Sequence, residues 1–262
     1  MSILELRAVT KAFGGIMACR DVSFSIRQGQ IMGLIGPNGA GKTTMFNLIT
    51  GVYAPTSGSI LFKDREIAGV RPDKVATRGI ARTFQNIRLF RNLSVLDNVC
   101  IAVDKHVHYP FVAALLRTAG VLKREQEIRE QALAYLGEVG LADRANVRAD
   151  SLPYGLQRKL EIARALALQP SLLLLDEPAA GMNPEESLDL AKLVRRIHQR
   201  YDLTILLIEH HMDVVMELCE NIFVLNFGLK LAEGDAADIQ NNPDVLKAYL
   251  GEGYKRVRSQ QS

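Results

Sequence analysis

Short apolar runs separated by turn residues make up most of the first third of the chain. Three of these runs predict β-strands at residues 3–9, 22–26 and 31–35, with a polar turn at 27–30. A turn containing proline, serine and glycine, at 55–58, precedes the apolar residues of the stretch 58–62, around which another strand pair is expected. The chain therefore opens with a segment rich in β-structure.

The pattern changes to helical periodicity over about residues 93–150. Within the stretch 124–139, apolar side chains recur at intervals that place them on one face of a helix. We therefore expect a helical insert in this part of the chain. The apolar positions of that helical face are Ile128, Ala132, Tyr135, Leu136 and Val139.

Helices and strands alternate again after the insert. Helices are expected at 157–168 and 184–200, and continuous apolar runs predict strands at 172–175 and 203–208. Alternation of this kind favours a mainly parallel core sheet. Ligands of such sheets lie beyond the carboxyl ends of the strands, so a functional site is expected at that edge.

A glycine-rich segment joins the apolar run 31–35 to a helical sequence that begins at Met45. Its glycines let the backbone wrap closely around a phosphate chain, so that N–H groups and the helix N-terminus face the negative oxygens. Lys42 supplies a positive charge for the β- and γ-phosphates, and the Thr43 hydroxyl is placed to coordinate Mg²⁺. The sequence thus predicts a phosphate-binding loop made of Gly36, Pro37, Asn38, Gly39, Ala40, Gly41, Lys42, Thr43 and Thr44.

Polar residues follow two further apolar strands. Asp176 is suited to hold Mg²⁺ and Glu177 to polarise the water that attacks the γ-phosphate, although a solvated acidic cap at the strand end is the alternative. His210 follows the strand at 203–208, where contact with the γ-phosphate competes with a buried structural histidine. Counting the phosphate loop, candidate functional residues thus follow three predicted strands, and we expect them at one edge of the sheet.

Composition limits the classes of protein that remain. The 262 residues suffice for one large α/β domain, and no apolar stretch approaches the roughly 18 to 20 residues of a membrane helix. The N-terminal residues lack the uninterrupted apolar region of a secretory signal, so a cytoplasmic protein is expected. A net charge of +3 gives no reason to expect nucleic acid as a partner. The three isolated cysteines, Cys19, Cys100 and Cys219, fit reduced thiols that serve as packing.

Five further segments carry a resemblance to one family. They occur in the family's order, and the resemblance extends over about residues 4–250. On these segments the chain resembles the ABC-type ATPases. The segments are similar to the Q-loop (82–86), the signature segment (152–158), the Walker B strand with its catalytic glutamate (172–178), the D-loop (180–183) and the switch-histidine loop (208–210).

This resemblance implies a fold and a reaction. The fold is expected to be α/β: a P-loop NTPase of the ABC ATPase type, with a mainly parallel core sheet, an antiparallel β subdomain and a helical insert. The reaction is ATP hydrolysis, with Glu177 and His210 as its catalytic residues. The single domain 1–262 then divides into a core at about 1–92 and 151–250, the insert at 93–150 and a short tail at 251–262.

The same resemblance implies ATP and Mg²⁺ as cofactors and adds residues to the site. Phe13 stands where the family has an aromatic residue that stacks on adenine. Gln85 becomes a Mg²⁺ ligand together with Thr43 and Asp176, and a sensor of the transmembrane partner. The signature residues are expected to contact the ATP that a second subunit binds, and they are Tyr154, Gly155, Leu156 and Gln157.

Four positions depart from the commonest family pattern. Pro153 replaces a serine whose hydroxyl reaches the γ-phosphate across the dimer, and proline has neither that hydroxyl nor an N–H. Leu156 replaces a polar signature residue, Asn183 the usual D-loop aspartate, and His211 an acidic residue after the switch histidine. The signature must then bind anions through the backbone of 154–156 and through a helix N-terminus.

The details are similar to a narrower group, the ATP-binding subunits of branched-chain amino-acid importers. This implies an ATPase that energises uptake of branched-chain, hydrophobic amino acids through partner permeases. The alternatives are another solute, such as urea or short amides, and a soluble ABC ATPase without a transport role; a P-loop kinase or GTPase leaves the signature segment unexplained. The similar segments are 36–47, 82–85, 89–91, 160–165, 176–184 and 241–251.

The expected partners follow from the same resemblance. One phosphate loop and one signature segment require a second ABC ATPase subunit, which is either a copy of this chain or a related one. Transmembrane permease subunits hold the protein on the inner face of the membrane, and an extracytoplasmic solute-binding protein acts indirectly. We expect the helical insert and the loop 85–90 to receive the permeases. The apolar stretch 111–116 either docks there or packs within the insert.

Overall fold

The computed structural model describes residues 1–104 and 118–249. These residues belong to two compact units, which we name the core unit (Met1–Arg82 with the chain from Ser171 onward) and the helical unit (Thr83–Pro170). The expected insert boundaries, at 93 and 150, lie inside the helical unit and stay predictions. The stretch 111–116 and the tail at 251–262 lie outside the described residues.

An antiparallel sheet forms the first part of the core unit, with the strand order β2-β1-β4-β5. The strands expected at 3–9 and 22–26 fall inside longer strands that pair along most of their length. The hairpin extends past the apolar runs because backbone pairing continues to its exposed tip, where side-chain periodicity gives no signal. The strands are β1 (Ser2–Phe13), β2 (Ile16–Arg27), β4 (Ser57–Phe62) and β5 (Arg65–Glu66).

A six-stranded sheet completes the β-structure of the core unit, in the order β10-β9-β3-β8-β7-β6. All pairs are parallel except β9 with β10. Every residue of β3, β7 and β8 is buried, as expected for parallel strands covered on both faces. The strands are β3 (Ile31–Ile35), β6 (Ile80–Arg82), β7 (Leu172–Asp176), β8 (Thr204–Ile208), β9 (Asn221–Asn226) and β10 (Leu229–Gly234).

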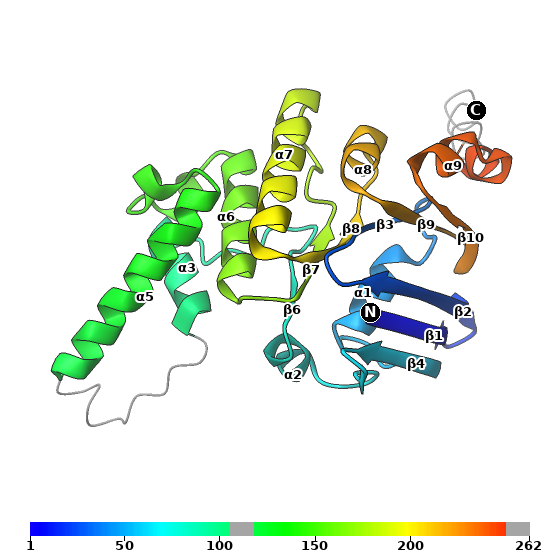
Figure 1. The fold of residues 1–262 in the computed structure, drawn as a ribbon, viewed down its shortest axis with the longest axis horizontal. Coiled ribbons are helices and arrows are strands. Elements are labelled where there is room, and N and C mark those ends of the chain that lie inside the picture. The colour runs from blue at the N-terminus through cyan, green and yellow to red at the C-terminus, as the bar shows by residue number, and fades with distance from the viewer. Residues whose placement is uncertain (105–117, 250–262) are drawn as a thin grey trace. The chain divides into compact units, whose positions relative to one another are not determined.

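The helices of the core unit cover these sheets (Figure 1). Helix α1 inserts an apolar face into a core that both sheets share, and its side chains Met45, Phe46, Leu48 and Ile49 are fully buried there. Helices α7 and α8 lie side by side. The helices are α1 (Lys42–Ile49), α2 (Pro72–Thr77), α7 (Pro184–Tyr201), α8 (Met212–Leu218) and α9 (Ala236–Asn241).

The helical unit packs three helices against one another (Figure 1): α3 (Val95–Val103), α5 (Ala119–Glu138) and α6 (Tyr154–Ala167). The expected apolar face of α5 is present, with Ile128, Ala132 and Leu136 buried and Tyr135 half-buried. Two short 3₁₀ turns, Ala142–Arg144 and Ala149–Ser151, lead from α5 to α6. No helix in residues 1–104 and 118–249 is both long and apolar enough to cross a membrane.

Candidate functional site

The loop between β3 and α1 follows a backbone path that only glycine accepts at two positions. Gly36 has a φ of 150°, and a Cβ there would stand 2.0 Å from the carbonyl oxygen of Leu225. Gly41 has a φ of 105°, and its Cβ would approach the carbonyl oxygen of Ala18 to 2.7 Å. The loop is therefore pressed against the neighbouring strands, and side chains at these positions would displace it.

The first turn of α1 and the side chain of Lys42 form a cationic cradle. Gly41 precedes α1 and has no side chain to cap it, so an external acceptor is needed for the first N–H groups of the helix. The buried Lys42 ammonium donates to the carbonyl oxygens of Gly36, at 2.6 Å, and Pro37, at 2.9 Å. A positive charge next to a helix N-terminus suits a phosphate group, so this donor set fits the predicted nucleotide.

Asp176, the last residue of β7, is held by an arginine. Its Oδ2 accepts a hydrogen bond from Arg82 Nη2 at 2.7 Å, and the two side chains are only 4 % and 7 % exposed. Arg82 also donates to Asn47 Oδ1, at 2.7 Å, and lies over the ring of Phe46. Asp176 is therefore a fixed, buried carboxylate and not a solvated cap. Its oxygens, with the exposed hydroxyl of Thr43, are the ligand type that Mg²⁺ prefers.

Glu177 and His210 meet at the carboxyl ends of β7 and β8. The distance between Glu177 Oε1 and His210 Nε2 is 2.8 Å, and the Glu177 N–H donates to the carbonyl of Ile208 at 2.9 Å. Glu177 has a φ of 47°, an unusual value for a residue with a side chain. His210 is 37 % exposed, so it is not a buried structural histidine. The pair can move a proton at a carboxylate whose orientation the imidazole helps to fix.

Three predicted elements of the core unit thus come together at one sheet edge. The strand order places β3, β8 and β7 next to one another, so the phosphate loop, His210 and the Asp176–Glu177 pair follow adjacent strands. Phe13 lies at the end of β1, 41 % exposed, with its ring centroid 5.0 Å from that of Tyr53 and 4.9 Å from Lys11 Nζ. Its predicted role in adenine stacking stays a prediction.

The signature residues form the first turn of α6 in the helical unit. Pro153 occupies the N-cap position, where a missing N–H leaves no hydrogen bond unmade, and its carbonyl accepts from Leu156 and Gln157. The Gln157 side chain donates to the carbonyl of Leu152 at 2.8 Å. The helix therefore begins without a side-chain cap, which leaves its first N–H groups as donors for an anion.

The loop that contains Gln85 is held by a buried ion pair of α6. Arg158 donates to the carbonyl oxygens of Phe84, at 2.5 Å, and Gln85, and also to the hydroxyl of Tyr154. Glu161 lies 3.1 Å from Arg158 and accepts from the N–H groups of Phe84 and Arg88. The backbone of 84–88 is thus fixed by side chains from the helix that begins with the signature residues.

Two residues with direct contacts at the site have no role in the expectations from sequence. Arg82 ends β6, and the sequence signal was the short apolar pair Ile80 and Ala81, which is too brief to define a strand by periodicity. Glu209 separates β8 from His210, is 1 % exposed, and binds backbone N–H groups through both carboxylate oxygens. A charged residue directly after a buried strand was a signal that could have identified it.

A phosphate loop, a strand-end aspartate and a glutamate–histidine pair on adjacent parallel strands define a nucleotide-binding ATPase of the P-loop class. Family comparisons give the same class: residues 19–180 match the family model described as ABC transporter, and residues 230–255 match the one described as Branched-chain amino acid ATP-binding cassette transporter. The chain belongs to the ABC transporter family and is one of its ATPases.

Individual relatives cover nearly the whole chain. It is 45 % identical to the high-affinity branched-chain amino acid transport ATP-binding protein BraF of Pseudomonas aeruginosa, and 43 % identical to LivG of Escherichia coli, a protein with the same description; each match covers 95 % of this chain and 98 % of the relative. Among solved structures, the ADP conformation of an ATP-binding cassette of an ABC transporter is similar, with a TM-score of 0.84 and 30 % identity over 96 % of this chain and 99 % of the other.

Proposed function

We propose that this protein is the ATP-hydrolysing subunit of an importer for branched-chain amino acids. The observation that carries this proposal is the contact between Glu177 and His210 at the ends of β7 and β8, with the phosphate loop of Lys42 following the adjacent strand β3. The chain is also similar over 95 % of its length to an ATP-binding protein of branched-chain amino acid transport. The geometry supports the reaction, and the relatives support the solute.

Different residues of the core unit have different roles in ATP hydrolysis. Lys42 and the first N–H groups of α1 neutralise phosphate oxygens, while Glu177 accepts the proton of the attacking water and His210 keeps the carboxylate in position. Asp176 and Thr43 would hold Mg²⁺, with Arg82 orienting Asp176. Bound Mg–ATP supplies the transferable phosphoryl group and the charge of the metal.

The partners are proposed on the same basis. A second ATPase subunit, a copy of this chain or a related one, presents its signature residues to the nucleotide held here, and Tyr154, Gly155, Leu156 and Gln157 serve the partner's nucleotide in return. Gln85 senses the permease subunits, through which the protein is held at the inner face of the membrane. The dimeric state of a related solved cassette, 25 % identical, is consistent with such pairing.

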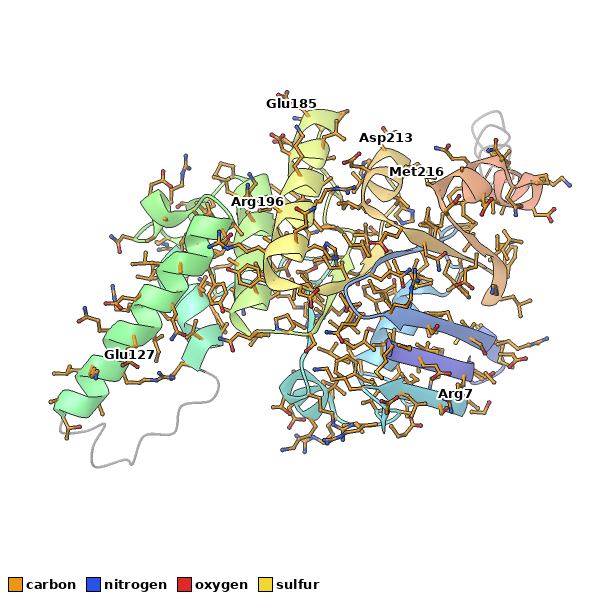
Figure 2. The ribbon with its side chains drawn as sticks, in the orientation of Figure 1. Arg7, Glu127, Glu185, Arg196, Asp213 and Met216 are labelled. Atoms are coloured by element: carbon orange, nitrogen blue, oxygen red, sulfur yellow. The ribbon has the colours of Figure 1, made fainter. Side chains whose placement is uncertain are left out.

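The proposal is tested with Glu177→Gln in cells that normally make the protein. Glutamine keeps the shape of the side chain but accepts protons poorly, so ATP hydrolysis should fall by about a hundredfold or more while ATP binding stays within a few-fold. Glu185→Gln is the matched control, because Glu185 is an exposed glutamate at the start of α7 (Figure 2). The measurement is uptake of leucine, isoleucine and valine beside urea and short amides.

The possible outcomes test the identity of the transported solute separately from the role in transport. Loss of branched-chain amino acid uptake, with the control unchanged, supports the proposal in full. Loss of urea or amide uptake instead would support a transport ATPase but show that its solute is not a branched-chain amino acid. Normal uptake of every solute by cells whose Glu177→Gln protein no longer hydrolyses ATP would contradict a transport role, and near-normal hydrolysis would contradict the role of Glu177.

A further inference from the structure

Glu209 is a buried carboxylate at the edge of the hydrolytic pair. It lies between the end of β8 and His210, and only 1 % of its surface is exposed. Its Oε1 accepts the N–H of Ala179 at 2.7 Å. Its Oε2 accepts the N–H groups of His210, at 2.9 Å, and His211, at 3.2 Å. One side chain therefore binds two separate loops of the core unit.

The partners of this carboxylate explain how a charge can be buried here. Burial of an ionised carboxylate is costly unless hydrogen bonds replace its hydration, and three backbone N–H groups do so in this site. The ring of His211 adds a contact, with Nδ1 at 3.2 Å from Oε2, although that ring is 46 % exposed. Glu209 is thus fixed mainly by the backbone of the loops that it joins.

The residues of the proposed chemistry lie in or directly before those two loops. Ala179 lies two residues after Glu177, and His210 follows Glu209 directly. The β7–β8 pairing ends with Asp176 opposite Ile208, and the N–H of Glu177 still donates to Ile208. Beyond that point backbone pairing gives way, and the Glu209 carboxylate bridges the two chains as they leave the sheet.

We propose that Glu209 is a positioning residue for ATP hydrolysis, which sets the distance between Glu177 and His210 by tying the loop 178–183 to the His210 backbone. The proposal rests on the function proposed above, because it assigns Glu209 to the same reaction. Glu209 does not touch the reacting atoms itself. It maintains the 2.8 Å contact between Glu177 and His210 that keeps the Glu177 carboxylate oriented to accept the proton of the attacking water.

Glu209→Gln tests this role with the least change in shape. A glutamine has one acceptor oxygen, which is expected to serve the two N–H groups of His210 and His211, so its NH₂ group would face the N–H of Ala179. That backbone bond is then lost. We expect kcat for ATP hydrolysis to fall by about ten- to a hundredfold, with KM for ATP within about threefold, because Lys42 and its loop are unchanged.

Amide hydrogen exchange provides a second, direct measurement. In Glu209→Gln the amide of Ala179 should exchange about tenfold faster, whereas the amides of α1 should keep their rates. Asp213→Asn is the matched control, since it removes a carboxylate from an exposed position at the start of α8 (Figure 2). The control should leave both kcat and exchange at Ala179 as in the unchanged protein.

Several results would overturn the role of Glu209. Unchanged kcat in a folded Glu209→Gln protein, an equal loss in Asp213→Asn, or a rise in KM without a fall in kcat would each do so. If Glu209→Gln does not fold, amide exchange is measured in the unchanged protein instead. Fast exchange at different rates for the Ala179 and His210 amides would overturn the proposal, and slow exchange at a shared rate would support it. If the unchanged protein, assayed with ATP in the complex with its partner subunits, does not hydrolyse it, the proposed function fails, while the exchange measurement still tests the bridge.

Discussion

The phosphate loop of the core unit and the loop 84–88 of the helical unit are held by different means. In the core unit, the glycine backbone fixes the phosphate loop against neighbouring strands, and Lys42 donates to the carbonyl oxygens of Gly36 and Pro37 within that loop. In the helical unit, the loop 84–88 is fixed by charged side chains, Arg158 and Glu161, that are buried with it. Lys42 in the phosphate loop is arranged for chemistry, whereas Arg158 and Glu161 are arranged to support the loop 84–88. Substitutions should therefore separate activity from stability.

Two ion pairs of the helical unit show how much burial matters. Arg158–Glu161 and Arg124–Glu127 are both spaced i,i+3 and have similar distances, 3.1 Å and 2.9 Å. The side chains of the first pair are 2 % and 6 % exposed, and those of the second 39 % and 40 %. Burial raises the pKa of the Glu161 carboxyl, while the Phe84 N–H and Arg158 act in the opposite direction. Loss of one partner of the buried pair is therefore expected to destabilise the protein strongly, and loss of one partner of the exposed pair is not.

The largest expected effect is a loss of stability in Arg158→Met. This change leaves Glu161 buried without its cation and removes the donors to the Phe84 and Gln85 carbonyls, so the free energy of unfolding should fall by about 3–5 kcal/mol. Arg124→Met, the matched control, should change it by about 0.5 kcal/mol or less. Urea unfolding of the full chain measures both, and equal losses would contradict the distinction between the two pairs.

Lys42→Ala, in contrast, should affect ATP binding much more than stability. Removing the ammonium from the phosphate loop should weaken ATP binding by about a hundredfold, since a charge-assisted contact with phosphate is lost. The free energy of unfolding should fall by only about 1 kcal/mol, the usual worth of hydrogen bonds within a loop. Calorimetric titration with ATP gives the affinity, and Lys74→Ala, at an exposed lysine of α2, is the control. Retained tight binding would disprove the role of Lys42.

The strand ends were predictable from sequence because their signals are local. The runs before Gly36 and Asp176 are continuous and apolar, and both prove to be fully buried parallel strands. The helical face of α5 was equally readable, because three of its residues recur at four-residue spacing and are buried. In each case the apolar pattern and the residues that end the strand or helix lie in one short stretch of the chain.

The supporting contacts were not predictable because they join distant parts of the chain. Arg82 meets Asp176 across 94 positions, and Arg158 meets Phe84 across 74. A charged residue normally lies in solvent, so nothing local marks these two as buried. Strand β6 was not predicted because three residues are too few for a periodicity signal, whereas β9 contains an apolar run from which a strand could have been predicted. Tertiary pairing, and not propensity, places such residues.

The smallest expected effect concerns Asn183, which stands in place of the usual D-loop aspartate. It caps α7: its side chain accepts the Glu186 N–H at 2.9 Å, and its own N–H donates to the Glu186 carboxylate at 3.0 Å. Asn183→Ala should lower the free energy of unfolding by about 1 kcal/mol. Asn183→Asp keeps an acceptor and adds a charge that favours the helix N-terminus, so it should be neutral or stabilising by a few tenths of a kcal/mol.

The control for this pair of variants is Glu185→Ala, in the same helical turn but outside the capping hydrogen bonds, which should cost less than Asn183→Ala. Thermal or urea unfolding ranks the three. If Asn183→Asp matches the unchanged protein, asparagine and aspartate are equivalent as caps, and the departure from the family pattern then requires no different arrangement of this loop. A loss in Asn183→Asp as large as that in Asn183→Ala would mean that the amide nitrogen, and not the shared acceptor oxygen, is what this position needs.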